Sequence, residues 1–210
     1  MKTCIDLSQY NRVIDDDPRA DGVILRLGFT GYGSNRPSLD KTFEKNFDRY
    51  KERVPVGAYY VTLATTPDAV RRETDFVKEE LNGRFLQLPL WVDVEAQSHH
   101  FGWTFASKRE RSEAVALWCE TMESAGYYVG VYANKYWFDS MLDTTLLSPF
   151  DKWVAQYNKK CTYTKTPFGM WQFTSKGDGR AHGIDGHVDI SYMYKDYPTI
   201  IKNKGLNGWG

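Results

Sequence analysis

The sequence is poor in several features that define whole classes of protein. Its 210 residues include three cysteines, Cys4, Cys119 and Cys161, which lie too far apart to indicate a disulfide framework or a zinc site. We expect buried, reduced thiols. Neither sign of charge is in excess, since 27 Lys and Arg balance 27 Asp and Glu, and this argues against nucleic acid as a partner. No apolar run exceeds the length of a strand, so no membrane insertion is predicted.

Sequence motifs for cofactors and for several enzyme classes are also missing. There is no glycine-rich phosphate loop and no Gly-x-Ser-x-Gly elbow. His99 and His100 are adjacent and so cannot easily share a metal ion, and His182 and His187 lie in a glycine-rich loop. We therefore predict no cofactor and no metal. Asp6 interrupts the apolar stretch that follows Lys2, so no secretory signal peptide is expected.

What the sequence does contain is an alternation of short apolar runs and helical patterns. Several runs are apolar on both faces, as the strands of a buried parallel sheet are. The eight strand candidates are Thr3–Leu7, Gly22–Leu27, Val56–Leu63, Pro89–Val94, Tyr128–Ala133, Lys152–Tyr157, Met170–Thr174 and His187–Ser191. The fold class predicted from them is α/β, an irregular barrel closed largely by parallel strands. An open doubly wound sheet is the structural alternative.

Helices are predicted mainly in the first two-thirds of the chain. Thr66 and Pro67 indicate a helix start, and Ser107 with Glu110 forms a capping box. The predicted helices are Leu39–Arg53, Thr66 to Leu81, Ser107 to Ala125, Tyr136–Leu142 and a last one over about Tyr194–Lys202. We assign residues 1–201 to the barrel and residues 202–210 to a tail or linker stub.

Acidic residues mark the ends or centres of three strand candidates. Asp93 and Glu95 are two residues apart at the end of one strand, so their side chains point to the same face. When two carboxyl groups lie so close together, their like charges repel and the pKa of one of them rises. A general acid requires such a raised pKa. Asp6 ends the first strand and Asp189 lies within the last. In a barrel the first and last strands are neighbours, and we expect the carboxyl ends of all strands to face one mouth. The fold hypothesis therefore brings the four acids together.

Aromatic residues are the unusual part of the composition, at 15% of the chain. Tyr59, Tyr132, Trp153 and Trp171 lie in or beside strand candidates, and Gln156 is close to Trp153 in sequence. Such rings can fill a core. Flat rings beside amide groups also suit sugars, which have apolar faces and hydroxyl edges.

The chain resembles the family 25 glycoside hydrolases, which are lysozymes (N-acetylmuramidases) found in many phage endolysins. Each motif is short, but nine of them follow in the right order between Cys4 and about Tyr194. They are Ile5–Ser8, Val23–Gly28, Asp40–Asn46, Val56–Tyr59, Pro89–Glu95, Val129–Asn134, Trp153–Tyr157, Trp171–Ser175 and Val188–Ile190.

This resemblance implies a TIM-like (β/α) barrel of about five βα units followed by strands with few helices. The family's proton donor falls on Glu95, and its accompanying aspartates fall on Asp6, Asp93 and Asp189. The substrate groove would be lined by Tyr59, Tyr132, Trp153 and Trp171, with Asp40 and Gln156 nearby.

The implied reaction is hydrolysis of the β-1,4 bond between N-acetylmuramic acid and N-acetylglucosamine in bacterial peptidoglycan. Whether a carboxylate attacks directly or the N-acetyl group of the substrate does so stays open. The alternatives are a chitinase-like glycosidase, whose two earlier acids are missing before Asp93, and a non-catalytic glycan-binding barrel. The resemblance also implies synthesis in a host cytoplasm, action on the cell wall after release, and a wall-binding domain C-terminal to this chain.

Overall fold

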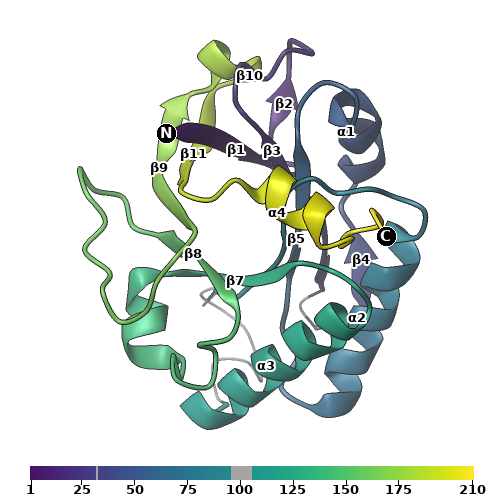
Figure 1. The fold of residues 1–210 in the computed structure, drawn as a ribbon, viewed down its shortest axis with the longest axis vertical. Helices are drawn as coiled ribbons and strands as arrows, with labels where there is room; N and C mark the ends of the chain where they lie inside the picture. The colour runs from purple at the N-terminus through teal and green to yellow at the C-terminus, as the bar shows by residue number, and fades with distance from the viewer. Residues whose placement is uncertain (32, 96–105) are drawn as a thin grey trace.

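The computed structural model describes residues 1–31, 33–95 and 106–210, and its centre is a closed β-barrel (Figure 1). Within these residues eight strands form the barrel, and β1 pairs with both β3 and β11, which closes the sheet. The predicted barrel is confirmed, and the open doubly wound alternative is wrong. In spatial order the strands are β1 (Lys2–Leu7), β3 (Val23–Thr30), β5 (Val56–Val61), β6 (Leu90–Asp93), β7 (Val129–Asn134), β8 (Asp151–Ala155), β9 (Met170–Asp178) and β11 (His187–Met193).

One strand runs against the others. Strand β11 is antiparallel to both of its neighbours, β9 and β1, whereas the remaining barrel pairs are parallel. The expectation that the carboxyl ends of all strands meet at one mouth is therefore wrong for β11. Its first residues lie at the mouth instead, and Asp189 there is the Cα partner of Asp6.

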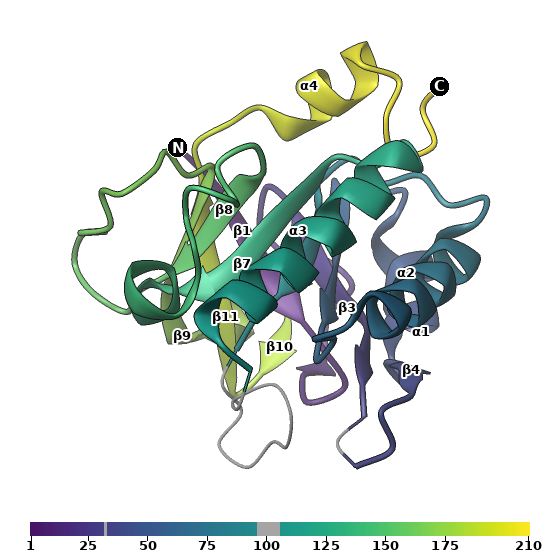
Figure 2. The same ribbon diagram turned by 90° about the horizontal axis from the view of Figure 1, so that it is seen from below.

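Helices α1 (Phe43–Tyr50), α2 (Pro67–Leu81) and α3 (Lys108–Ser124) pack outside the barrel (Figure 2). The predicted helix starts are confirmed. The Thr66 hydroxyl accepts a hydrogen bond from the Ala69 amide, and Ser107 and Glu110 form the reciprocal capping box. Helix α1 is shorter than predicted because β4 (Pro37–Leu39) pairs with β3 and the chain turns before the helix begins.

Helices become short and few after α3, as expected. The segment predicted as a helix over Tyr136–Leu142 is a π-helical turn, Trp137–Met141. A two-stranded sheet of β2 (Arg12–Val13) and β10 (Ile184–Asp185) lies next to the short 3-10 turn Gly179–His182. Among the described helices, none combines the length and the apolar character that crossing a membrane requires.

Strand alternation divides the apolar residues into two layers. Side chains such as Ile5 and Val23 point outward into the layer beneath the helices. Their neighbours Cys4 and Ile24 point inward, into a second cluster with Trp91. Helix α4 (Tyr197–Asn203) adds side chains to this inner cluster and crosses the end of the barrel opposite the mouth (Figure 2). The cysteines are free thiols, with Cys4 and Cys119 buried and Cys161 half-buried.

The residues after Lys202 are packed against the barrel, and the predicted boundary at that residue falls inside α4. Asn207 is fully buried there. Its side-chain oxygen accepts a hydrogen bond from the Tyr128 amide (2.7 Å), and its side-chain nitrogen donates to the Leu88 carbonyl (3.0 Å). One side chain thus ties the C-terminal residues to the segments that lead into β6 and β7.

Replacing Asn207 by Ala should destabilise the fold without touching the mouth. Two buried backbone groups would lose their partners, so the free energy of unfolding should fall by roughly 2–3 kcal/mol in urea denaturation. Asn203→Ala, at an exposed position in the last turn of α4, is the matched control. Equal stability of the two variants would contradict this anchoring role.

Candidate active site

Four carboxyl groups meet in one cleft at the mouth of the barrel. The cleft has a volume of about 200 Å³. It is lined by the side chains of Asp6, Tyr59, Asp93, Glu95, Tyr132, Trp153, Tyr157, Gln172 and Asp189. The four acids that the sequence places on three strands are therefore neighbours, as predicted, and so are Tyr59, Tyr132 and Trp153.

Strand periodicity explains why these acids face inward. Asp6 follows the inward-facing Cys4 by two residues on β1, and Asp93 follows the inward-facing Trp91 by two residues on β6. Glu95 continues this alternation just beyond the end of β6. Asp189 is brought alongside Asp6 by the antiparallel pairing of β11 with β1.

Aromatic rings form the floor beneath the acids. The ring of Trp153 is buried and lies 4.6 Å from that of Tyr132 and 5.6 Å from that of Trp91, between centroids. Its indole nitrogen donates to the Ser191 hydroxyl (2.9 Å). Gly130 makes room for the neighbouring indole, because a Cβ there would lie 2.2 Å from a Trp91 ring carbon. The acids thus lie over a rigid apolar surface that excludes water from below.

Burial in this environment raises the pKa of all four acids. For Asp6, Asp93 and Glu95 the main cause is desolvation, and the proximity of other carboxylates adds to it for Asp6 and Asp93. Burial and the nearby charge of Glu95 raise the pKa of Asp189 to about 6. A site in which carboxyl groups hold protons near neutral pH can supply a general acid.

Gln172 connects the acids to the tyrosines. Its amide nitrogen donates to the Asp6 carboxylate (3.0 Å), and its amide oxygen accepts from the hydroxyls of Tyr132 (2.9 Å) and Tyr157 (3.1 Å). Neither Gln172 nor Tyr157 was among the predicted site residues. The sequence signal for Gln172 is the alternation of side chains along β9. Because Trp171 and Gln172 are consecutive, only one of them can face the barrel interior.

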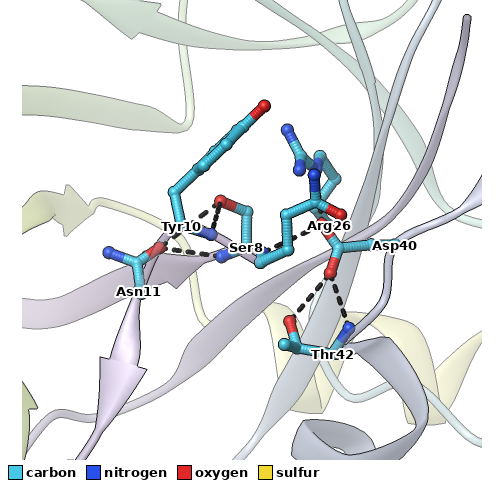
Figure 3. Close-up of polar contacts among 7 residues, drawn as sticks. Ser8, Tyr10, Asn11, Arg26, Asp40 and Thr42 are labelled. Atoms are coloured by element: carbon cyan, nitrogen blue, oxygen red, sulfur yellow. Dashed lines mark hydrogen bonds and ion pairs between the residues drawn. The ribbon is translucent and has the colours of Figure 1, made fainter.

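Asp40 lies outside the cleft lining, and its carboxylate is fully engaged with protein groups (Figure 3). One of its oxygens accepts from Arg26 Nε (2.7 Å) and from the Gln9 amide (3.0 Å). The other accepts from the amide and hydroxyl of Thr42 (2.9 and 2.7 Å). Arg26 in turn stands next to Tyr59 in the sheet register, and its charge lowers the pKa of Asp93. Asp40 therefore influences the four acids indirectly, by holding Arg26, and does not line the cleft.

Two further predicted residues are also not brought into the cleft. Trp171 lies on the opposite face of β9 from Gln172, where its ring contacts Phe173 and Tyr192 and its nitrogen donates to the Gln156 carbonyl (2.8 Å). The Gln156 side chain binds Thr162 through both amide atoms. His99 and His100 lie outside the described residues. Within the described ranges, no three His, Cys, Asp or Glu side chains form a group that could hold a metal ion.

Desolvated, closely grouped carboxyl groups over an aromatic floor are typical of glycoside hydrolases. Sequence comparison agrees with this class, because the model of the glycosyl hydrolases family 25 matches residues 5–182. The chain belongs to that family. Asp189 lies just beyond the matched segment, and the pairing of β11 with β1 brings it into the cleft. No curated protein matches the chain in sequence.

Solved structures share the fold at low sequence identity. The modular autolysin LytC from Streptococcus pneumoniae is 25% identical with a TM-score of 0.77, over 90% of this chain and 46% of that one. The catalytic domain of the endolysin ply40 from bacteriophage P40 of Listeria monocytogenes is 20% identical with a TM-score of 0.75, over 98% of both chains. A muramidase from Acremonium alcalophilum is 14% identical with a TM-score of 0.76, over 99% of this chain and 100% of that one. The chain thus spans about half the length of LytC.

Replacing Asp40 by Asn should separate an indirect role from direct substrate binding. The amide would face Arg26 Nε with its own donor, so stability should fall by about 3 kcal/mol, as when a buried ion pair loses one partner. We expect kcat to fall roughly tenfold or more through the displaced Arg26, with little change in KM. The exposed Asp75→Asn is the control. A large rise in KM at unchanged kcat would show instead that Asp40 contacts the sugar.

Replacing Asp189 by Asn should stabilise the protein in a pH-dependent way. The pKa of Asp189 is about 6 in the folded protein, against about 4 when unfolded, so stability falls as the pH rises through that window. Asp189→Asn removes this loss, so its gain over the wild type should be near zero at pH 4 and roughly 2–3 kcal/mol above pH 6.5. Urea denaturation at both pH values, beside Asp75→Asn, measures it. A variant no more stable than the wild type at pH 7 would refute the assignment.

Proposed function

We propose that the protein is a muramidase that cleaves the β-1,4 bond between N-acetylmuramic acid and N-acetylglucosamine in bacterial peptidoglycan. The observation that carries this proposal is the convergence of Asp6, Asp93, Glu95 and Asp189 in one cleft over Trp153. Four desolvated acids argue against a pure binding module, because their burial costs folding free energy and what it provides, a proton donor, is not needed for binding alone.

Glu95 is the proposed general acid. It stands at the end of its strand, where the cleft opens, and burial raises its pKa, which favours the protonated form that a general acid needs. As the bond to that oxygen breaks, the proton passes from Glu95 to the leaving sugar. The carboxylates opposite Glu95 stabilise the positive charge that develops on the sugar ring.

Two routes complete the reaction. In one, an aspartate oxygen bonds to the anomeric carbon, and water later displaces it with Glu95 acting as base. In the other, the carbonyl oxygen of the substrate's own N-acetyl group forms that bond, and an aspartate orients its N–H. Both regenerate the protonated Glu95 and consume one water molecule.

The cleft walls suit a neutral, hydroxyl-rich polymer. Tyr157 is 58% exposed at the rim and offers a ring face, while Tyr59 offers a polar edge. The balanced charge of 27 basic and 27 acidic residues gives no general attraction to an anionic wall. Binding should therefore rest on contacts in the groove, with modest dependence on salt.

The solved relatives support this substrate. One LytC structure is described as a complex with a synthetic peptidoglycan ligand, and the structure from Acremonium alcalophilum is described as a muramidase. LytC is also described as modular. We include in the proposal that a wall-binding domain works together with this barrel.

Mass spectrometry of purified peptidoglycan digested by the wild type and by Glu95→Gln tests the proposal. The wild type should release fragments with a reducing N-acetylmuramic acid end, and Glu95→Gln should slow this release by at least about a hundredfold. Glu52→Gln, an exposed position, is the control. Reducing N-acetylglucosamine ends would make the protein a glucosaminidase instead. Glycan that is bound but left intact would mean that the cleft only recognises it.

A further inference from the structure

Gln172 is buried at the centre of the acid cleft, with 2% of its surface exposed. It reaches the interior from β9, where it is the register partner of Ala155 on one side and Ser191 on the other. Its side-chain amide contacts one acid, Asp6, and two phenols, Tyr132 and Tyr157, at 2.9–3.1 Å. All of these hydrogen bonds join groups of the protein itself, so they form without a bound sugar.

The orientation of the Gln172 amide determines which group donates and which accepts in each of these three hydrogen bonds. If the amide were turned over, its oxygen would face the Asp6 carboxylate and its nitrogen would face two hydroxyls. The observed orientation instead lets the nitrogen donate to Asp6 while the oxygen accepts from both phenols. Each phenol has one proton, so a hydroxyl that donates to Gln172 has only lone pairs left for other neighbours.

The consequence is different for Asp6 and for Glu95. Burial and the charge of Asp189 raise the pKa of Asp6, and the N–H donor that Asp6 receives from Gln172 works against both because it favours the ionised form. A hydrogen bond from the Tyr132 hydroxyl lowers the pKa of Glu95, but Tyr132 has only one proton and also donates to Gln172. Gln172 therefore competes with Glu95 for that proton, and this competition favours the protonated form of Glu95. The Gln172 amide thus favours the ionised form of Asp6 and the protonated form of Glu95.

We propose that Gln172 is a positioning residue that sets where the proton of the acid cleft resides, holding Asp6 as a carboxylate and leaving Glu95 as the proton donor. This inference rests on the proposed glycosidase function. It adds Gln172 as the residue that determines which acid donates the proton and which acid is ionised. Gln172 itself touches neither the sugar nor the bond that breaks.

The other charged and titratable groups around this pair come from every side of the cleft. Asp189 on β11 and Asp93 on β6 oppose ionisation of the cluster, and Arg26 on β3 favours ionisation of Asp93. Tyr59 on β5 also lines the cleft. Among these described groups, Gln172 is the one that hydrogen-bonds Asp6 and both phenols at once, so its substitution should move the pH profile selectively.

Replacing Gln172 by Glu gives a sharp test, because a protonated Glu reproduces the amide pattern. Its O–H would donate to Asp6 and its carbonyl would accept from the two phenols. Once ionised, it would be a second carboxylate about 3 Å from Asp6, and the pattern would fail. We expect kcat within about threefold of the wild type near pH 5, and an alkaline limb displaced downward by at least about one pH unit. KM should stay within about twofold.

Gln172→Met and Gln87→Glu complete the experiment. Met fills the space without either polar group, so kcat should fall about a hundredfold at its optimum with no acidic recovery, and the two limbs of the pH profile should move toward each other. Gln87→Glu makes the same chemical change at the opposite end of the barrel and should leave the profile unchanged. If Gln172→Glu and Gln172→Met lower kcat by one constant factor without moving either limb, Gln172 is only structural and the proposal is overturned.

A measurement on the unmodified protein covers the case in which the variants do not fold. Carbon-13 NMR titration of the carboxyl groups should show Asp6 ionising at lower pH than Glu95, and the reverse order would overturn the proposal. Failure here is distinguishable from failure of the proposed function. A wild type that releases reducing N-acetylmuramic acid ends but shows the reverse order refutes only the role of Gln172.

Discussion

The pairing of β1 with two partners at once is the constraint on which the rest of the structure depends. β1 lies parallel to β3 and antiparallel to β11, and only both contacts together close the sheet. Closure brings Asp6 and Asp189 together, although they are separated by most of the chain, and it faces them toward the end of β6 with Asp93 and Glu95. An open sheet would leave these acids at distant edges, where water would keep their pKa values ordinary.

Closure of the barrel buries a group of acids, and this burial costs folding free energy. Four carboxyl groups lie over Trp153 and Tyr132, and their desolvation works against the ionised state. Two fixed groups limit this strain on the cluster. Arg26, held by Asp40, favours the charge on Asp93, and the Gln172 amide favours the charge on Asp6. In the proposed reaction, this unequal support of Asp93 and Asp6 on one side and Glu95 on the other provides a proton donor with ionised neighbours.

Local patterns in the sequence were enough to predict the eight strands, the caps of α2 and α3 and the convergence of the four acids. Strand direction was not readable, because β11 has the same apolar pattern whether it runs parallel or antiparallel. The choice between Trp171 and Gln172 was also beyond a pattern of alternation, which says that one faces inward without saying which. Asp40 was predicted to lie near the substrate, but its hydrogen bonds to Arg26 and Thr42 depend on a turn that only the folded chain defines.

In the proposed reaction Glu95 faces the scissile oxygen while the aspartates face the sugar ring. A crystal structure of the Glu95→Gln variant with a peptidoglycan fragment bound across the mouth tests it most directly. We expect the glycosidic oxygen within hydrogen-bonding distance of residue 95 and the adjoining sugar above Trp153, with Asp6 and Asp189 beside its anomeric carbon. A fragment whose glycosidic oxygen faces Asp189, or one that binds away from the four acids, would contradict it.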